Sequence, residues 1–285
     1  MRRVSIRDLL KRLPQVAVCR KLTRQWFPVS LAYLGIHKLH YPFRLQLRTG
    51  ESLILHEMTD VVVFWLVFVR HHYPVASIDK TIVDIGANIG VFTLYAARAA
   101  PSANILAVEP FPDTCERLRE MLRMNHLERR VTVVNAAITG SSGVVLMDVS
   151  AGVPSQYRSV LSEVPQLLNR EHKLYSQAEG GVPVTTITLD ELLSTHRLEH
   201  VDLVKMNIHG NEYEVLLSSP ASVLRRFERI ALQYHDVPES LGLGKQDLFR
   251  ELEAKGFHLV SDADTGRGAG RAVLAQTSQG DWRAA

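Results

Sequence analysis

A strand, a glycine turn and a helix follow one another directly in Val83-Asp84-Ile85-Gly86-Ala87-Asn88-Ile89-Gly90, and this segment constrains the fold most strongly. Gly86 has no Cβ, so the backbone can turn sharply and approach a ligand closely. Gly90 is expected to let the first helical turn pack tightly on the sheet. In an open parallel sheet such a turn lies at the carboxyl end of its strand, where the crevice binds ligands.

Short β-branched runs alternate with amphipathic helical segments from residue 81 onward, which is typical of a parallel sheet covered on both faces. The pattern predicts strands at residues 81–85, 104–108, 131–135, 201–208 and 229–234 and helices at residues 89–100, 112–125, 211–226 and 246–255. A hairpin of residues 257–260 and 271–275 is expected to close the sheet edge with one antiparallel strand. We therefore predict an α/β fold with a Rossmann-like, doubly wound, mostly parallel sheet.

Residues 1–78 precede this alternation and are expected to form an N-terminal helical and hairpin extension to a domain of residues 79–285. A basic, helix-prone stretch is followed by alternating strands at residues 43–48 and 52–55, with Thr49-Gly50 at the turn. A helix is expected at residues 61–70. Residues 141–181 interrupt the βα rhythm and are too long for an ordinary connection, which indicates a substrate-side insertion.

Composition excludes several classes of protein. The net charge of +3 over 285 residues indicates no broad nucleic-acid-binding surface. The longest apolar run, residues 61–69, has about half of the ~20 residues needed to span a bilayer. Cys19 and Cys115 form no metal or redox motif, and the N-terminus lacks a secretory apolar stretch. We expect a cytoplasmic protein.

The N-terminal segment is rich in Arg and Lys that alternate with apolar residues such as Leu9, Leu10 and Leu13. Such a helix can rest peripherally on an anionic membrane. The alternative is that its charges form the solvated face of a packed helix. No feature of the sequence specifies an oligomeric state.

The glycine turn also indicates the kind of cofactor. A dinucleotide site usually has the spacing G-x-G-x-x-G, in which the middle glycine makes room for a pyrophosphate. Here that position is Asn88, so a cofactor without pyrophosphate, such as S-adenosylmethionine, fits better. Asp84 can accept hydrogen bonds from loop amides or from the cofactor's ammonium group. Glu109 lies 23 residues after Gly86, near the ~20-residue spacing at which an acid binds ribose hydroxyls.

Two of these cofactor predictions have a structural alternative. Glu109 can be a solvated acid at a helix entry, and Asn135-Ala136 can be a plain turn rather than a border of the adenine. The residues expected at the cofactor are Asp84, Gly86, Ala87, Asn88, Gly90, Glu109, Pro110, Asn135 and Ala136.

Five segments jointly resemble the FkbM-type methyltransferase family, and the resemblance extends from about Phe43 to Asp236. They are Asp84 to Gly90, Val108-Glu109-Pro110, Val133 to Ile138, Val182 to Asp190 and Val204-Lys205-Met206-Asn207-Ile208-His209-Gly210-Asn211-Glu212. The resemblance implies a class I methyltransferase sheet and S-adenosylmethionine as methyl donor. It also implies O-methylation of a small-molecule, natural-product or glycan hydroxyl.

The chain departs from this family where the motif resembles K-I-D-V-E-G-x-E. Asn207 stands in place of the aspartate and His209 in place of the glutamate, and Gln233 lies near a usual acid on the fifth strand. We predict no metal site, because Mg²⁺ prefers carboxylate oxygens.

Methyl transfer to an alcohol is an in-line displacement that needs close positioning and a group to take the proton. His209 is the first candidate for this base and His235 the second, since imidazole titrates near neutral pH. The alternative for each is a hydrogen-bonded structural histidine. Asn207 is expected to orient a ligand or to cap the following helix. Lys205 lies on a buried strand and should pair with a carboxylate such as Asp84.

The remaining expectations concern the acceptor pocket and competing functions. Trp65, Phe68 and Tyr73 are expected in the helical core, with an acceptor wall as the alternative, and Glu212 can reach the crevice. We favour a histidine-assisted, metal-independent O-methyltransferase. A cofactor-binding protein that has lost catalysis and serves as a partner-binding module is the second hypothesis. A nicotinamide-dependent oxidoreductase is the third, and Asn88 argues against it.

Overall fold

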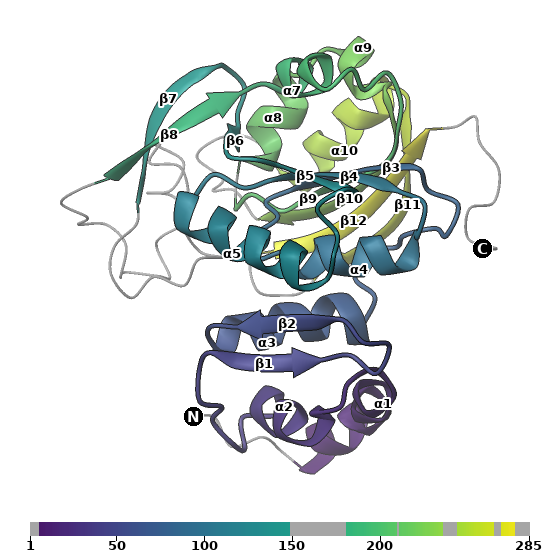
Figure 1. The fold of residues 1–285 in the computed structure, drawn as a ribbon. Coiled ribbons are helices and arrows are strands. Elements are labelled where there is room, and N and C mark those ends of the chain that lie inside the picture. The colour runs from purple at the N-terminus through teal and green to yellow at the C-terminus, as the bar shows by residue number, and fades with distance from the viewer. Residues whose placement is uncertain (1–5, 149–180, 210, 236–243, 265–268, 277–285) are drawn as a thin grey trace.

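The computed structural model describes residues 6–148, 181–209, 211–235, 244–264 and 269–276 (Figure 1). Its central sheet has seven strands in the order β11-β12-β10-β9-β3-β4-β5. Neighbouring strands are parallel except at β12, which is antiparallel to both β10 and β11. The strands are β3 (Thr81–Ile85), β4 (Asn104–Val108), β5 (Val131–Val134), β9 (Val201–Met206), β10 (Phe227–His235), β11 (Phe257–Asp264) and β12 (Ala269–Gln276).

This strand order confirms the predicted doubly wound sheet. The chain builds β3, β4 and β5 outward in one direction and then returns to place β9 and β10 on the other side of β3. The reversal between β3 and β9 leaves a crevice at the carboxyl ends of these strands. The antiparallel strand expected at the closing edge is β12, which pairs with the outermost strand β11 as a hairpin.

Helices cover both faces of the sheet (Figure 1). One apolar core lies between the sheet and α4 and α5, and the other lies between the sheet and α7, α8 and α10. The helices are α4 (Val91–Ala99), α5 (Pro112–Met124), α7 (Leu189–Thr195), α8 (Glu212–Ser218), α9 (Ala221–Leu224) and α10 (Lys245–Ala254). The single helix predicted at residues 211–226 is wrong, because Pro220 adopts an extended ψ of 147° and separates α8 from α9.

The N-terminal segment packs beneath α4 and α5 (Figure 1). Its elements are α1 (Ile6–Leu22), α2 (Trp26–Tyr33), β1 (Phe43–Gln46), β2 (Ser52–Leu55), α3 (Met58–Phe64) and a π-helical turn, η1 (Trp65–Val69). Trp65 and Phe68 are fully buried in the same core as Phe92 of α4. Among the described helices, none combines the length and apolar character needed to cross a bilayer. The boundary at residue 78 stays a prediction.

A second sheet was not predicted. Its strands are β6 (Ala137–Ile138), β8 (Gly181–Ile187) and β7 (Gly143–Asp148), in that order. β7 and β8 pair antiparallel across the predicted insertion, whose residues 149–180 lie outside the described part of the chain. This pairing joins segments distant in sequence, so no local pattern indicates it.

The two glycines of the turn make room for protein atoms rather than for a ligand. A Cβ on Gly86, whose φ is +77°, would lie 2.2 Å from the carbonyl oxygen of Asn207. A Cβ on Gly90 would lie 2.3 Å from Met121 Cε and 2.6 Å from Leu118 Cδ1, both on α5. Gly90 therefore allows close packing against α5, so the contact that requires glycine is with this helix rather than with the sheet.

We predict that Gly86→Ala lowers the free energy of unfolding by roughly 3 kcal/mol or more, from backbone strain and the clash with a rigid carbonyl. Gly35 is the matched control, since its φ is +72° but a Cβ added there would have no described atom within 4 Å. Gly35→Ala should cost only the strain, about 1–2 kcal/mol. Urea unfolding measures both free energies. If Gly86→Ala and Gly35→Ala lower the free energy of unfolding equally, the close approach of the Asn207 carbonyl is not the reason for glycine at position 86.

Candidate active site

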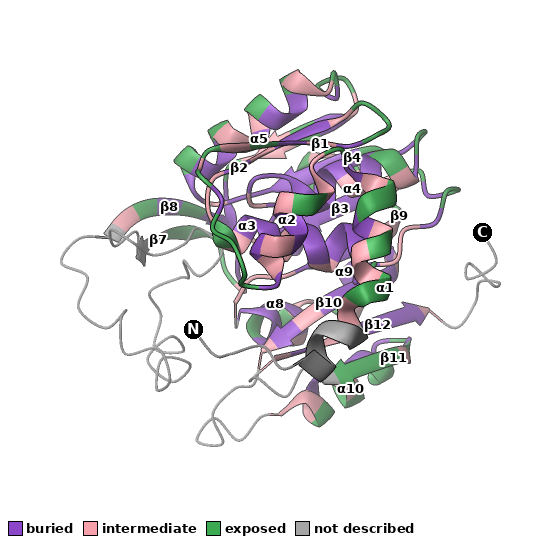
Figure 2. Cartoon of the chain, turned by 90° about the horizontal axis from the view of Figure 1, so that it is seen from below, coloured by how far each residue is buried: buried purple, intermediate pink, exposed green. Residues whose placement is uncertain are grey.

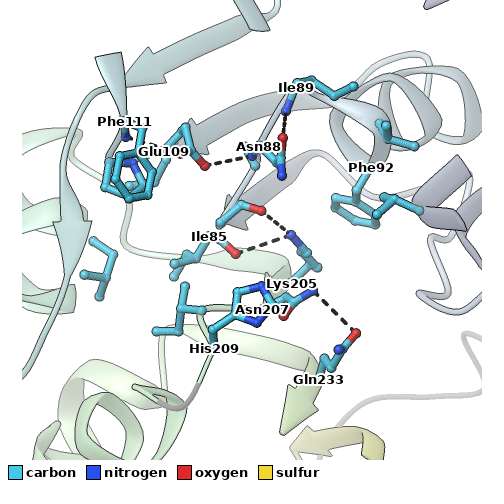
Figure 3. Close-up of a pocket in the computed structure, with 18 of the residues that line it drawn as sticks. Ile85, Asn88, Ile89, Phe92, Glu109, Phe111, Lys205, Asn207, His209 and Gln233 are labelled. Atoms are coloured by element: carbon cyan, nitrogen blue, oxygen red, sulfur yellow. Dashed lines mark hydrogen bonds between the residues drawn. The ribbon is translucent and has the colours of Figure 1, made fainter. Parts of the chain in front are cut away.

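A cavity opens at the carboxyl ends of the parallel strands, where the strand order reverses (Figure 3). Its volume is about 1310 Å³, a value that includes the open mouth. Gly86 and Glu109 line the same cavity, as a cofactor site formed by both requires. The lining also includes the loop after β9, the end of β10 and the face of α3 and η1.

Glu109 is 5% exposed and holds the loops around it. Its Oε2 accepts a hydrogen bond from the backbone N–H of Asn88 at 2.9 Å, and its Oε1 accepts one from Phe111 at 3.2 Å (Figure 3). Burial raises the pKa of Glu109 to about 7, against the lowering effect of these two amides. The alternative of a solvated helix-entry acid is therefore wrong.

Several neighbours of Glu109 lie where the sequence predicts. Ala87, Asn88, Pro110 and Ala136 line the cavity. Asn135 is placed differently, because its amide nitrogen donates to the carbonyl oxygens of Glu109 at 3.0 Å and Pro110 at 2.8 Å. Asn135 thus holds the loop rather than facing the cavity.

Asp84 does not line the cavity, which corrects its predicted contact with the cofactor. Its side chain is fully buried; Oδ1 accepts from Lys205 Nζ at 2.9 Å and Oδ2 from the hydroxyl of Thr93 at 2.7 Å. The predicted pairing of Lys205 is confirmed. The same ammonium donates to the carbonyl oxygen of Gly86 at 2.7 Å, so Asp84 supports the turn through Lys205.

Asn207 and Gln233 face the cavity beside this pair (Figure 3). Asn207 Nδ2 donates to Gln233 Oε1 at 3.4 Å, and the hydroxyl of Tyr73 donates to the same oxygen at 3.2 Å. Asn207 Oδ1 is buried without a hydrogen-bond partner among the described residues. The cap of α8 is Asn211, so the capping alternative for Asn207 is wrong. Its oxygen is placed to accept a hydrogen bond from a bound molecule.

His209 lines the cavity and adopts a positive φ of +52°. Burial, followed by the nearby His235, lowers the pKa of His209 to about 3, so the imidazole is neutral at pH 7. The ring centroids of the two histidines are 4.9 Å apart. His209 therefore presents a neutral, weakly basic imidazole to the cavity.

His235 stands behind His209 rather than on the cavity surface. Its Nδ1 lies 3.2 Å from Oε1 of the fully buried Glu212. Burial opposes ionisation of Glu212, but His235 and the N–H of Ile208, which donates at 2.8 Å, bring its pKa below the usual value. Glu212 thus fixes His235 and the loop that carries His209.

The N-terminal segment supplies one wall of the cavity. The sequence left open whether its aromatic residues line an acceptor pocket or belong to the core. Tyr73 lines the cavity, whereas Trp65 and Phe68 belong to the core. The wall is largely apolar and consists of Val62, Val63, Leu66 and Val67. At its end lies Asp60, whose pKa burial raises to about 6.

We predict that Asp84→Asn lowers the free energy of unfolding by roughly 3–5 kcal/mol, because Lys205 stays buried without its carboxylate. The double variant Asp84→Asn with Lys205→Met should recover part of the loss. Urea unfolding of both proteins measures the difference. A double variant no more stable than the single one would contradict the ion pair as the cause.

We predict that Glu109→Gln flattens the dependence of stability on pH. The carboxyl has a pKa near 4.5 when unfolded and about 7 when folded, so the folded protein binds more protons in between. This group's stabilising contribution is therefore present below pH 4.5 and is lost as the pH rises through 7. Relative to wild type, the variant should gain about 2–3 kcal/mol between pH 4.5 and 8.

Thermal unfolding across this pH range checks the prediction. Glu120→Gln, at an exposed position of α5, is the control and should follow the wild-type profile. Parallel profiles for Glu109→Gln and wild type would show that Glu109 ionises without a penalty.

Comparison with known proteins shows which family the chain belongs to. The model of the methyltransferase FkbM domain matches residues 84–259. Methyltransferase sdnD of Sordaria araneosa is 30% identical over 214 residues, which cover 69% of this chain and 81% of that protein. The 31-O-demethyl-FK506 methyltransferase FkbM of Streptomyces tacrolimicus is 23% identical over 69% of this chain and 79% of its own length.

The hexuronic acid methyltransferase AglP of Haloferax volcanii is also similar, with 30% identity over 50% of this chain and 50% of its own. The family model covers the glycine turn, Glu109, the loop after β9 and all of β10 in one continuous match that ends within β11. The resemblance drawn from the sequence is confirmed, and the chain belongs to the FkbM methyltransferase family.

Proposed function

We propose that this protein transfers a methyl group from S-adenosylmethionine to a hydroxyl oxygen of a small molecule or glycan. One observation carries the proposal: the glycine turn, Glu109, Asn207 and His209 line a single cavity. The first two suit a nucleoside-bearing donor and the last two suit an acceptor hydroxyl. Because the family consists of methyltransferases, the nicotinamide hypothesis is set aside.

The donor half of the site suits an adenosyl cofactor. Each oxygen of Glu109 receives one backbone N–H, which leaves lone pairs that can accept from two ribose hydroxyls. The apolar side chains of Phe111 and Ile138 also line the cavity and suit an adenine ring. When bound, the cofactor supplies an electrophilic methyl group on a sulfonium.

The acceptor half needs to orient a hydroxyl and take its proton. The buried Oδ1 of Asn207 can accept a hydrogen bond from a second polar hydrogen of the acceptor molecule and so orient the reacting hydroxyl, whose own proton is then directed to His209. Neutral His209 can then accept the proton. A weak base suffices, since the O–H becomes acidic as the oxygen's electrons move to the methyl carbon. This route uses protein groups in place of the carboxylates that the family motif carries.

The apolar wall narrows the class of acceptor. Val62, Val63 and Leu66 would contact a molecule beside the reacting hydroxyl, and apolar contact favours an acceptor with a hydrocarbon face. The names of two relatives indicate different acceptors: one acts on an FK506 compound and the other on a hexuronic acid. We propose an amphipathic natural product or glycoconjugate rather than a free sugar.

We predict that His209→Ala lowers kcat by about 100-fold or more with a confirmed acceptor, the usual effect of losing a general base. The affinity for S-adenosylhomocysteine should change by less than about threefold, since His209 acts on the acceptor side. His258→Ala, at an exposed position of β11, is the control and should keep wild-type turnover.

The acceptor is found first by incubating the protein with labelled methyl donor and panels of polyketides, glycolipids and sugars. Full turnover by His209→Ala would overturn the base assignment. A protein that binds S-adenosylhomocysteine but methylates no member of the panels would favour the non-catalytic hypothesis.

A further inference from the structure

The charge of this chain is distributed unevenly. Eleven Lys or Arg and one acid fall within residues 1–50, whereas 22 Lys or Arg and 29 acids fall within residues 51–285. Residues 9–50 contain no Asp or Glu. The small net charge of the whole chain therefore conceals a strongly basic N-terminal segment beside an acidic catalytic domain.

Much of this basic charge reaches solvent together with large apolar side chains. Leu13, Phe27 and Ile36 are 53%, 56% and 58% exposed. The N-terminal surface, as we define it, consists of these three residues with the exposed Arg20, Lys21, Arg24 and Lys38. Exposed apolar side chains beside basic ones are the combination that suits contact with a membrane surface.

Two contacts show how the two helices that carry or flank these residues lie against each other. The guanidinium of Arg20 lies 5.6 Å from the ring centroid of Trp26, and that of Arg12 lies 5.4 Å from that of Tyr33. Helices α1 and α2 therefore run antiparallel, side by side. Leu13 is next to Arg12 and Ile36 follows Tyr33, so both lie at the same end of the pair. Phe27 lies at the other end, in edge contact with Trp26 at 5.5 Å between centroids.

The opposite face of this helix pair is already occupied. Cys19 and Val29 are fully buried in the core shared with α3 and η1. The N-terminal surface thus faces away from the central sheet, on the side of the molecule viewed in Figure 2. It lies on the segment that also supplies the apolar wall of the cavity.

We propose that the N-terminal surface docks the protein on an anionic lipid membrane. Lys and Arg are attracted to anionic headgroups, while exposed Phe and Leu enter the boundary between headgroups and acyl chains. A symmetric dimer through this surface is disfavoured, because two copies of the same basic surface would repel each other. A nucleic acid would engage the basic residues but leave the three apolar side chains without a partner.

The experiment is sedimentation of the full chain with vesicles of phosphatidylcholine alone and vesicles with about a third phosphatidylglycerol. We expect binding to the anionic vesicles only, weakened by salt. The triple variant L13S, F27S, I36S and the double variant K21E, R24E should each weaken binding at least about tenfold.

Matched control variants come from exposed positions elsewhere on the molecule. I78S, V144S, L259S removes three apolar side chains that are 64%, 69% and 45% exposed, and R129E, R225E makes the same charge change. Both should bind like wild type, and circular dichroism checks that all variants are folded.

Three outcomes would overturn the proposal. They are the absence of binding to anionic vesicles, an equal loss in the control variants, and binding to a duplex oligonucleotide at a salt concentration where vesicles are not bound. Because vesicle binding is measured without cofactor or acceptor, its result is independent of the methyl-transfer proposal.

Discussion

The buried ion pair of Lys205 and Asp84 joins the two strands between which the sheet reverses direction. Asp84 lies on β3 and Lys205 opposite it on β9, with their side chains 0% and 5% exposed. Burying two charges is costly unless each is also hydrogen-bonded. Thr93 and the carbonyl oxygen of Gly86 provide these bonds, so the pair holds the glycine turn and the floor of the cavity in one arrangement.

The residues that face the cavity depend on this arrangement. With the turn held in place, Gly86 lies against the backbone of Asn207, and the loop after β9 brings His209 over the cavity. Glu212 then fixes that loop from below through the N–H of Ile208 and through His235. Asn207 and His209 therefore line the cavity on a framework of buried charged groups.

The N-terminal segment contributes to function through the same core. Its η1 turn packs on α4, and Tyr73 reaches Gln233 on β10. One side of this segment forms the apolar wall of the cavity and the other carries the basic N-terminal surface. The cavity and the proposed membrane contact thus belong to a single packed unit.

The sequence by itself determined the strands β3 and β4, the glycine turn and the identity of the acid at the second strand, because each depends on residues adjacent along the chain. β-branched runs, a glycine with positive φ and a proline at the first turn of α5 act within a few residues. The pairing of Lys205 could also be predicted, since a buried ammonium requires a carboxylate. The sequence could not predict whether Asp84 contacts a ligand or is the carboxylate that pairs with Lys205.

Only the tertiary structure decided which side chains meet across long separations in sequence. In the folded protein Asp84 pairs with Lys205 instead of lining the cavity, and Asn135 donates to the backbone of its neighbouring loop. Glu212 contacts His235, which lies beside His209. The tertiary structure also paired β7 with β8 and brought α3 to the mouth of the cavity. The physical reason is that burial and hydrogen bonding depend on neighbours in space, and a single sequence records only neighbours along the chain.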